Sequence, residues 1–153
     1  SFIYQIRELQ NGGEFVVLLF LAAWGNDTLA YCTGMLIGKH KMSPILSPKK
    51  SIEGLVGGIV GAAILGALYG LYLNTYIRFS FNPVTMFPIV CGLSGAVSVI
   101  GDLAASAIKR DSGIKDYGTL IPGHGGILDR FDSIIFIAPV IYYLTVMISG
   151  GAI

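Results

Sequence analysis

Long apolar runs separated by short polar segments dominate this 153-residue chain. A helix needs about 20 mostly apolar residues to cross a bilayer, and four of the runs reach or approach that length. We expect helices over residues 15–37, 55–76, 84–108 and 134–148, the last extending back towards residue 129. The pattern predicts an all-α fold, a polytopic membrane helix bundle with about four transmembrane helices.

The composition agrees with a membrane protein. Apolar residues make up 54% of the chain, charged residues make up 12%, and the mean hydropathy of +0.72 is outside the range of soluble domains. The net charge of +1 gives no sign of a nucleic-acid partner. Cys32 and Cys91 lie in apolar stretches and do not indicate a disulfide framework. The chain shows neither an initiator Met nor a signal-peptide pattern, so we expect residues 1–153 to be the C-terminal part of a longer chain and to form a single membrane domain.

Positive charge is concentrated in two of the three segments that connect the predicted helices. Alternate threading across the bilayer places segments 39–53 and 109–133 on one side and segment 74–83 on the other. Eight of the ten Lys and Arg residues then share one side, and only Arg7 and Arg78 lie opposite. The positive-inside rule predicts that the side with more cations is cytoplasmic.

Small residues recur at every fourth position in the second predicted helix, at Gly58, Ala62, Gly66 and Gly70. A stripe of this kind lets two helices approach closely. It fits either packing within one subunit or the face of a homodimer.

A polar face follows the third predicted helix, because five polar residues are spaced four apart and therefore share one side. They are Ser94, Ser98, Asp102, Ser106 and Arg110. Such a face must contact protein or water, so we expect Ser98 to line a polar cavity and Val97 to face lipid. Asp102 lies about two turns inside the helix, where it is either a functional carboxylate or the partner of Lys109 or Arg110 in an ion pair.

Much of the charge lies in residues 106–132, which read SAIKRDSGIKDYGTLIPGHGGILDRFD. Asp129 and Asp132 are three positions apart and would project from one side of a first helical turn. They could hold a hard cation through oxygen, or they could only complement the helix dipole. Four nearby cations could neutralise phosphate charge, namely Lys109, Arg110, Lys115 and Arg130. Carboxylates and cations together suggest a metal-dependent reaction on a polyphosphate.

The glycine-rich segment 122–126 also has two interpretations. Its backbone amides, directly before a helix, could cradle a phosphate, or it is only a turn. His124 within it could donate to phosphate, carry a proton or serve the turn. Lys49 and Lys50 could bind phosphate, but cations in such a segment ordinarily mark only a cytoplasmic surface.

A polar patch interrupts the first predicted helix at Asn26, Asp27, Thr28 and Tyr31. Packing explains Thr28 and Tyr31 easily, but it does not explain all four residues. Asp27 is therefore a candidate functional residue.

The run from Ser106 to Asp132 resembles the signature of the phosphatidate cytidylyltransferases, also called CDP-diacylglycerol synthases. The matching residues, without a gap, are Ser106, Lys109-Arg110, Lys115-Asp116, Gly118, Pro122, His124-Gly125-Gly126, Asp129-Arg130 and Asp132. Residues 27–31 and 47–54 resemble two further blocks of this family, which often has Thr and an aromatic residue where Ser51 and Ile52 stand. The resemblance covers about residues 15–150, and members usually carry additional N-terminal membrane helices.

The resemblance implies that CTP and phosphatidic acid react to give CDP-diacylglycerol and pyrophosphate, with Mg²⁺, alone or with a second cation, as cofactor. It implies that Asp102, Asp129 and Asp132 hold the metal and that Lys109 and Arg110 act with them in catalysis. The implied substrate-binding residues are Asp27, Lys49, Lys50, Ser106, Lys115, Asp116, His124, Gly125, Gly126 and Arg130. The expected partners are CTP, phosphatidic acid and membrane lipids, with a homodimer still open. The expected location is a bacterial inner (cell) membrane, with the active site facing the cytoplasm.

Three other functions share some of these sequence features. The nearest is a CTP-dependent enzyme of an ether-lipid phosphate, because apolar helix faces do not distinguish lipid tails. A CDP-alcohol phosphotransferase is excluded, since its motif needs Gly where Ser133 stands and acids further on, and residues 134–153 contain none. A cation transporter would explain Asp27 and Asp102 inside the membrane, but it leaves the dense basic segment unexplained.

Overall fold

A computed structural model describes residues 1–43, 47–114 and 128–148, without the side chains of residues 43, 47–49, 128–130 and 132. Its elements, in chain order, are α1 (Phe2–Glu8), α2 (Gly12–Ile37), β1 (Lys41–Ser43), β2 (Ser47–Ser51), α3 (Ile52–Tyr76), α4 (Pro83–Asp111) and α5 (Leu128–Ile148).

Three of these helices, α2, α3 and α4, are long and apolar enough to cross a membrane, judged by length and composition. Helix α5 has 21 residues. Its side chains are described without a gap only over Ser133–Ile148, a stretch shorter than α2, α3 or α4. A helix as long as α5 rises roughly 30 Å, which matches the hydrocarbon core of a bilayer. The predicted all-α membrane bundle is confirmed, and the protein is an integral membrane protein.

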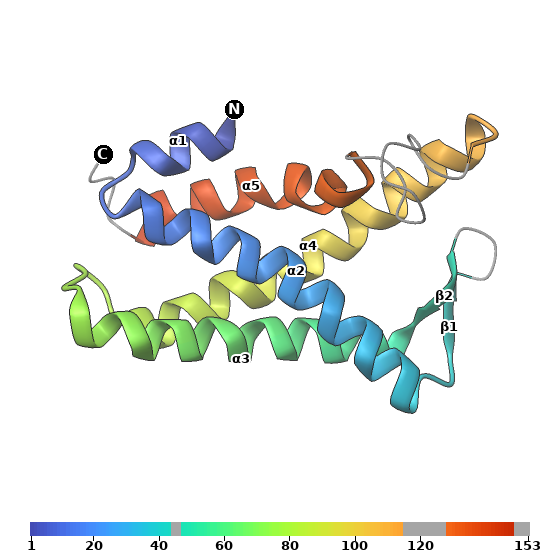
Figure 1. Ribbon diagram of the computed structural model, residues 1–153, viewed down its shortest axis with the longest axis horizontal. Coiled ribbons are helices and arrows are strands. Elements are labelled where there is room, and N and C mark those ends of the chain that lie inside the picture. Colours follow the sequence, from blue (N-terminus) through green and yellow to red (C-terminus); the bar gives the residue numbers. More distant parts are fainter. Residues whose placement is uncertain (44–46, 115–127, 149–153) are drawn as a thin grey trace.

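The four long helices alternate in direction, so their ends gather at two opposite ends of the bundle (Figure 1). The last turns of α2, both strands, the start of α3, the last turns of α4 and the start of α5 lie at one end, which we call the hairpin end. Helix α1, the start of α2 and the α3–α4 connection lie at the other. The ends of α4 and α5 that flank the second predicted basic segment therefore lie at the same end of the bundle as the hairpin.

Side-chain caps fix where α3 and α4 begin. Ser51 Oγ accepts a hydrogen bond of 3.1 Å from the Gly54 amide, and Asn82 Oδ1 accepts one of 3.0 Å from the Val84 amide. Pro83 stands at the first position of α4, where a missing N–H removes no helical hydrogen bond.

The hairpin is attached firmly to α3. Strands β1 and β2 pair antiparallel with Lys41 opposite Ser51, and α3 begins at the next residue. The Glu53 carboxylate accepts a hydrogen bond of 3.2 Å from the His40 amide and lies 2.6 Å from the ring Nδ1 of the same residue. These contacts hold the base of the hairpin against the first turn of α3.

The small-residue stripe of α3 packs inside the subunit. A Cβ on Gly54 would lie 2.7 Å from the Ala30 carbonyl oxygen of α2, and a Cβ on Gly66 would lie 2.7 Å from the Phe87 carbonyl oxygen of α4. Only glycine permits backbones to approach this closely. Of the two predicted roles for the stripe, packing within one subunit is the one that the structure shows.

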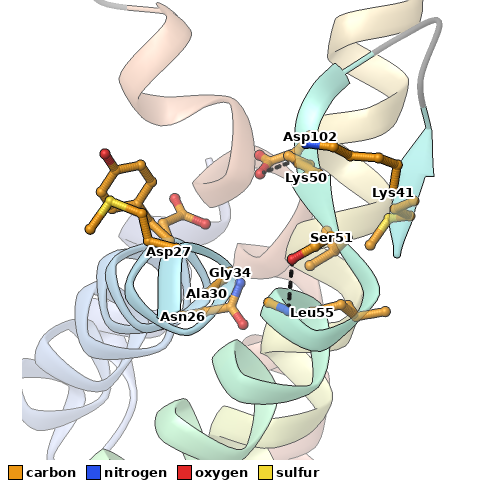
Figure 2. Close-up of a pocket in the computed structure, with 14 residues that line it drawn as sticks. Asn26, Asp27, Ala30, Gly34, Lys41, Lys50, Ser51, Leu55 and Asp102 are labelled. Atoms are coloured by element: carbon orange, nitrogen blue, oxygen red, sulfur yellow. Dashed lines mark hydrogen bonds and ion pairs between the residues drawn. The ribbon is translucent and has the colours of Figure 1, made fainter. Parts of the chain in front are cut away.

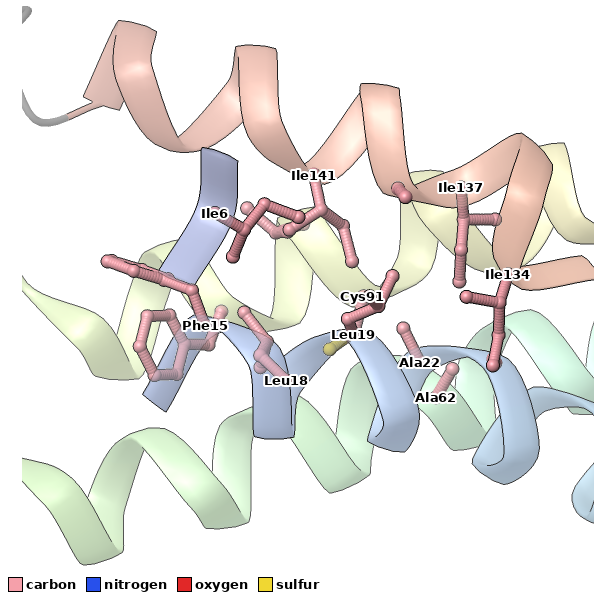
Figure 3. Packing of buried hydrophobic residues seen from close by; sticks show 14 of the residues in the cluster. Ile6, Phe15, Leu18, Leu19, Ala22, Ala62, Cys91, Ile134, Ile137 and Ile141 are labelled. Atoms are coloured by element: carbon pink, nitrogen blue, oxygen red, sulfur yellow. The ribbon is translucent and has the colours of Figure 1, made fainter. Parts of the chain in front are cut away.

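A hydrophobic cluster holds the five helices together (Figure 3). Helix α1 joins it through Ile6, which is fully buried. The labelled members in Figure 3 are Ile6, Phe15, Leu18, Leu19, Ala22, Ala62, Cys91, Ile134, Ile137 and Ile141. Cys91 is buried in this cluster and Cys32 is exposed, and both thiols are free, as predicted.

Two elements and one residue differ from the prediction. The hairpin was expected to be part of a loop, because Lys and Pro are depleted in strands. Helix α1 has only seven residues, too few for a clear periodic signal. The expectation that Val97 faces lipid is wrong, because it packs against the buried cluster, whereas Ile100 on the same helix is 65% exposed.

Candidate active site

A pocket of about 540 Å³ lies at the hairpin end, between α2, the hairpin, the start of α3 and α4 (Figure 2). Its lining combines polar and apolar side chains. The polar residues are Asn26, Asp27, Lys41, Lys50, Ser51 and Asp102. The apolar and aromatic residues are Ala30, Tyr31, Met35, Met42, Leu55 and Val99. Such a lining suits a ligand with a charged part and an apolar part.

Asp102 of α4 connects three elements at this pocket. Its Oδ2 lies 2.8 Å from Lys50 Nζ of β2, and its Oδ1 accepts a hydrogen bond of 2.6 Å from Ser133 Oγ of α5. The Lys50 side chain is 30% exposed and that of Asp102 is 19% exposed, so solvent screens this ion pair less than it would screen an open surface pair. The sequence suggested Lys109 or Arg110 as the partner, whereas Asp102 pairs with a residue 52 positions away.

Asp27 of α2 lies on the opposite wall of the pocket from Lys50 and Asp102 (Figure 2). Together with Lys41, the described lining therefore carries two carboxylates and two ammonium groups, whose charges balance. The structure brings together three residues, Asp27, Lys50 and Asp102, that the sequence had singled out in separate segments. Their roles in substrate or metal binding stay predictions.

Polar groups are also buried beside the pocket, where α2, α3 and α4 meet. A Cβ on Gly58 or Gly95 would lie within 2.9 Å of Asn26 Oδ1, so these glycines make room for a fully buried carboxamide. Ser94 and Ser98 are fully buried too, and within the described part of the chain none of the three side chains has a hydrogen-bond partner. The polar face of α4 thus points into the protein, as expected, but Ser98 is not part of the described pocket lining.

Three predicted residues follow Asp102 on α4. Ser106 is one turn further along, and Lys109 and Arg110 are about two turns further, towards the exposed end of the helix. Ser106 and Lys109 are half-buried and Arg110 is exposed, and the described lining of the pocket includes none of them. Their predicted roles in catalysis and substrate binding are not tested by this geometry.

The remaining predicted residues fall partly or wholly outside the described structure. Those wholly outside it are Lys115, Asp116, His124, Gly125 and Gly126. Those whose backbone is described in α5 or β2, but whose side chains are not, are Asp129, Arg130, Asp132 and Lys49.

The hydrogen bond from Ser133 holds the start of α5 beside Asp102. Positions four apart share one face of an α-helix, so position 129 lies on the same face of α5 as Ser133. Among the described side chains, no group of three His, Cys, Asp or Glu residues is gathered as a metal site. Asp102 still offers the ligand type that Mg²⁺ takes, a carboxylate, and one of its oxygens is paired with the Lys50 ammonium.

The sequence did not reveal two members of this site. Ser133 gave one usable signal, its spacing of four residues from Asp129 on the predicted helix. Lys41 gave none beyond its charge, because it reaches the pocket through a hairpin that the sequence did not predict.

The fold and the pocket define an integral membrane protein with a charged pocket at one end of its spanning helices. The chain belongs to the cytidylyltransferase family, which matches residues 1–148. It is 37% identical over 148 residues to the phosphatidate cytidylyltransferase of Staphylococcus saprophyticus, covering 97% of this chain and 55% of that protein. It is 40% identical over 145 residues to the phosphatidate cytidylyltransferase of Staphylococcus aureus, covering 95% and 53%. The chain thus spans about half the length of the curated relatives it matches.

Proposed function

We propose that the protein catalyses the transfer of the cytidylyl group of CTP to phosphatidic acid, which gives CDP-diacylglycerol and pyrophosphate. The observation that carries the proposal is the pocket around Asp102, which joins charged residues of α2, the hairpin and α4 at one end of the membrane helices in a chain of this family. The relatives bearing the name phosphatidate cytidylyltransferase support the choice of substrates.

In this reaction an oxygen of the lipid phosphate attacks the α-phosphorus of CTP. The bond from that phosphorus to the oxygen bridging to the β-phosphate breaks, and pyrophosphate leaves with the electron pair. The attacking oxygen is already anionic, so no side chain has to remove a proton. The task of the protein is to position two anions against each other, and Lys41 and Lys50 place ammonium groups in the pocket to offset their repulsion.

The metal ion of the reaction would be held by Asp102 together with Asp129 and Asp132. Support comes from the Ser133–Asp102 hydrogen bond, which joins the second turn of α5 to a carboxylate that lines the pocket. When bound, Mg²⁺ supplies positive charge to the triphosphate and orients its oxygens. The side chain of Asp102 would then contribute the α4 ligand, with Ser133 fixing the orientation of its carboxylate.

We assign the hairpin end to the cytoplasmic side of a bacterial cell membrane. The cations of segment 39–53 and of the last turn of α4 lie at this end, and the positive-inside rule places such an end in the cytoplasm, where CTP is found. The apolar wall formed by Tyr31, Met35 and Leu55 would accommodate the glycerol and the first part of the acyl chains.

Product analysis tests this function. The protein in membranes is incubated with Mg²⁺, labelled CTP and dioleoyl phosphatidic acid, and we expect CDP-diacylglycerol and pyrophosphate in equal amounts. A dialkyl phosphatidic acid in parallel shows whether an ether lipid is preferred. Cation flux through liposomes without CTP, in place of CTP-dependent product, would contradict the proposal and favour a transporter.

A further inference from the structure

Both carboxylate oxygens of Asp102 already have partners from other elements. Oδ1 accepts the Ser133 hydroxyl at 2.6 Å, and Oδ2 lies 2.8 Å from the Lys50 ammonium. A hydroxyl donor can stay when the carboxylate binds a metal ion. An ammonium group at the same oxygen is repelled by the metal ion, so a metal at Oδ2 weakens the contact of Lys50 with Asp102.

Lys50 is placed so that its side chain can move while its backbone stays fixed. Its neighbour Ser51 is paired in the hairpin and caps α3. The Lys50 side chain itself is 30% exposed within the pocket, and an ammonium on a four-carbon stem rotates easily between partners. The ammonium can therefore leave Asp102 without disturbing the hairpin.

The charge of the lining determines what the pocket can accept. Within the described lining, where two carboxylates and two lysines balance, a divalent cation alone would add positive charge and take Asp102 from Lys50 without giving its ammonium a new anionic partner. A nucleoside triphosphate brings several negative charges and gives both the metal and Lys50 new oxygen partners. Metal and nucleotide therefore favour each other's binding, and Lys50 is the group through which this coupling acts.

We propose that Lys50 occupies the position of the metal ion beside Asp102 and transfers to the phosphates of the nucleotide when metal and nucleotide bind, so that the site loads them together. This inference rests on the proposed function for the identity of the nucleotide. Lys50 is thus a positioning residue, one that keeps a metal ion from binding before its substrate.

Metal affinity measured without turnover tests the proposal. Binding of Mn²⁺ to the detergent-solubilised protein is followed by electron paramagnetic resonance, with and without the α,β-methylene analogue of CTP. For Lys50→Met we expect Mn²⁺ alone to bind about tenfold more tightly than it binds to wild type, a factor typical of coupled sites. The increase in Mn²⁺ affinity that the nucleotide analogue causes should become smaller by a similar factor. Lys50→Arg, which keeps the charge, should restore weak binding of Mn²⁺ alone.

The matched control is Lys39→Met, which removes the same charge from an exposed position outside the described pocket lining and should leave Mn²⁺ affinity unchanged. If Lys50→Met or Lys50→Gln binds Mn²⁺ alone no more tightly than wild type, the coupling role is wrong even if CDP-diacylglycerol is made. If the expected coupling is seen but no CDP-lipid is formed, the role of Lys50 stands and the proposed function fails.

Discussion

At the scale of single residues, the site depends on how Asp102 is held. A carboxylate among membrane helices is costly unless other groups compensate its charge. Lys50 and Ser133 provide this from two different elements, and a hydrogen bond to a charged group contributes about 1.5–3 kcal/mol. Asp102 is therefore both a structural junction of β2, α4 and α5 and a carboxylate oriented towards a pocket.

Ser133→Ala tests whether that orientation matters for the reaction. The variant loses the donor to Oδ1 but no charge, and we expect kcat to fall about tenfold, which corresponds to about 1.4 kcal/mol. The steady-state rate of pyrophosphate release in membranes is the measurement. Ser112→Ala, at an exposed position after α4, is the control and should keep wild-type activity. Equal rates for the two variants would show that Ser133 does not position Asp102.

At the scale of elements, glycine on α3 decides how closely the helices around the pocket approach. Gly54 and Gly58 face α2 near the site, and Gly66 and Gly70 face α4 further along. The helices thus meet backbone to backbone, and the pocket opens where the hairpin extends beyond this contact.

Gly58→Ala should destabilise the bundle, because a Cβ there would lie 2.8 Å from both Ala30 Cβ and Asn26 Oδ1. Overpacking of this kind costs about 1–3 kcal/mol. The control is Gly92→Ala, where the nearest atom to a Cβ among the described residues would be Ala63 Cβ at 3.7 Å, an ordinary contact. Thermal unfolding in detergent should show a lower Tm for Gly58→Ala and an unchanged or higher Tm for Gly92→Ala. Matching Tm values would contradict the close α2–α3 contact.

The long helices could be predicted from the sequence because membrane spans carry a strong, local signal of some 20 apolar residues. The hairpin could not, since its strands are short and polar and are defined by pairing with each other. In the site, too, single residues could be predicted from the sequence, but their contacts could not. Asp102 and Lys50 were each recognised by residue type and motif, but their ion pair depends on the hairpin folding back over α3.

At the scale of the whole molecule, the two ends of the bundle differ in chemistry. The hairpin end carries the charged pocket, while the opposite end carries α1 and the aromatic cluster of Phe15, Phe79, Phe81 and Phe87. A bundle with aromatic packing at one end and a charged pocket at the other suits the proposed reaction between a lipid and a water-soluble nucleotide. In the proposed reaction the lipid tails would stay among apolar helix faces while the phosphates would meet at the charged end.

The most direct test of this account compares two Asp→Asn substitutions on α4. Asp102 lies in the pocket, whereas Asp111 is exposed at the last position of the helix and outside the described pocket lining. Both variants lose one carboxylate charge from the same element. The quantity to measure is CTP-dependent formation of CDP-diacylglycerol in membranes at saturating Mg²⁺. The amount of folded protein is matched between the variants by size-exclusion chromatography.

We predict that Asp102→Asn lowers turnover about a thousandfold or more, because loss of a metal ligand removes several kcal/mol of transition-state stabilisation. Asp111→Asn should stay within about twofold of wild type, as expected for an exposed surface charge. If Asp102→Asn retained more than about a tenth of wild-type turnover, a loss under about 1.4 kcal/mol, the pocket around Asp102 would not be the active site.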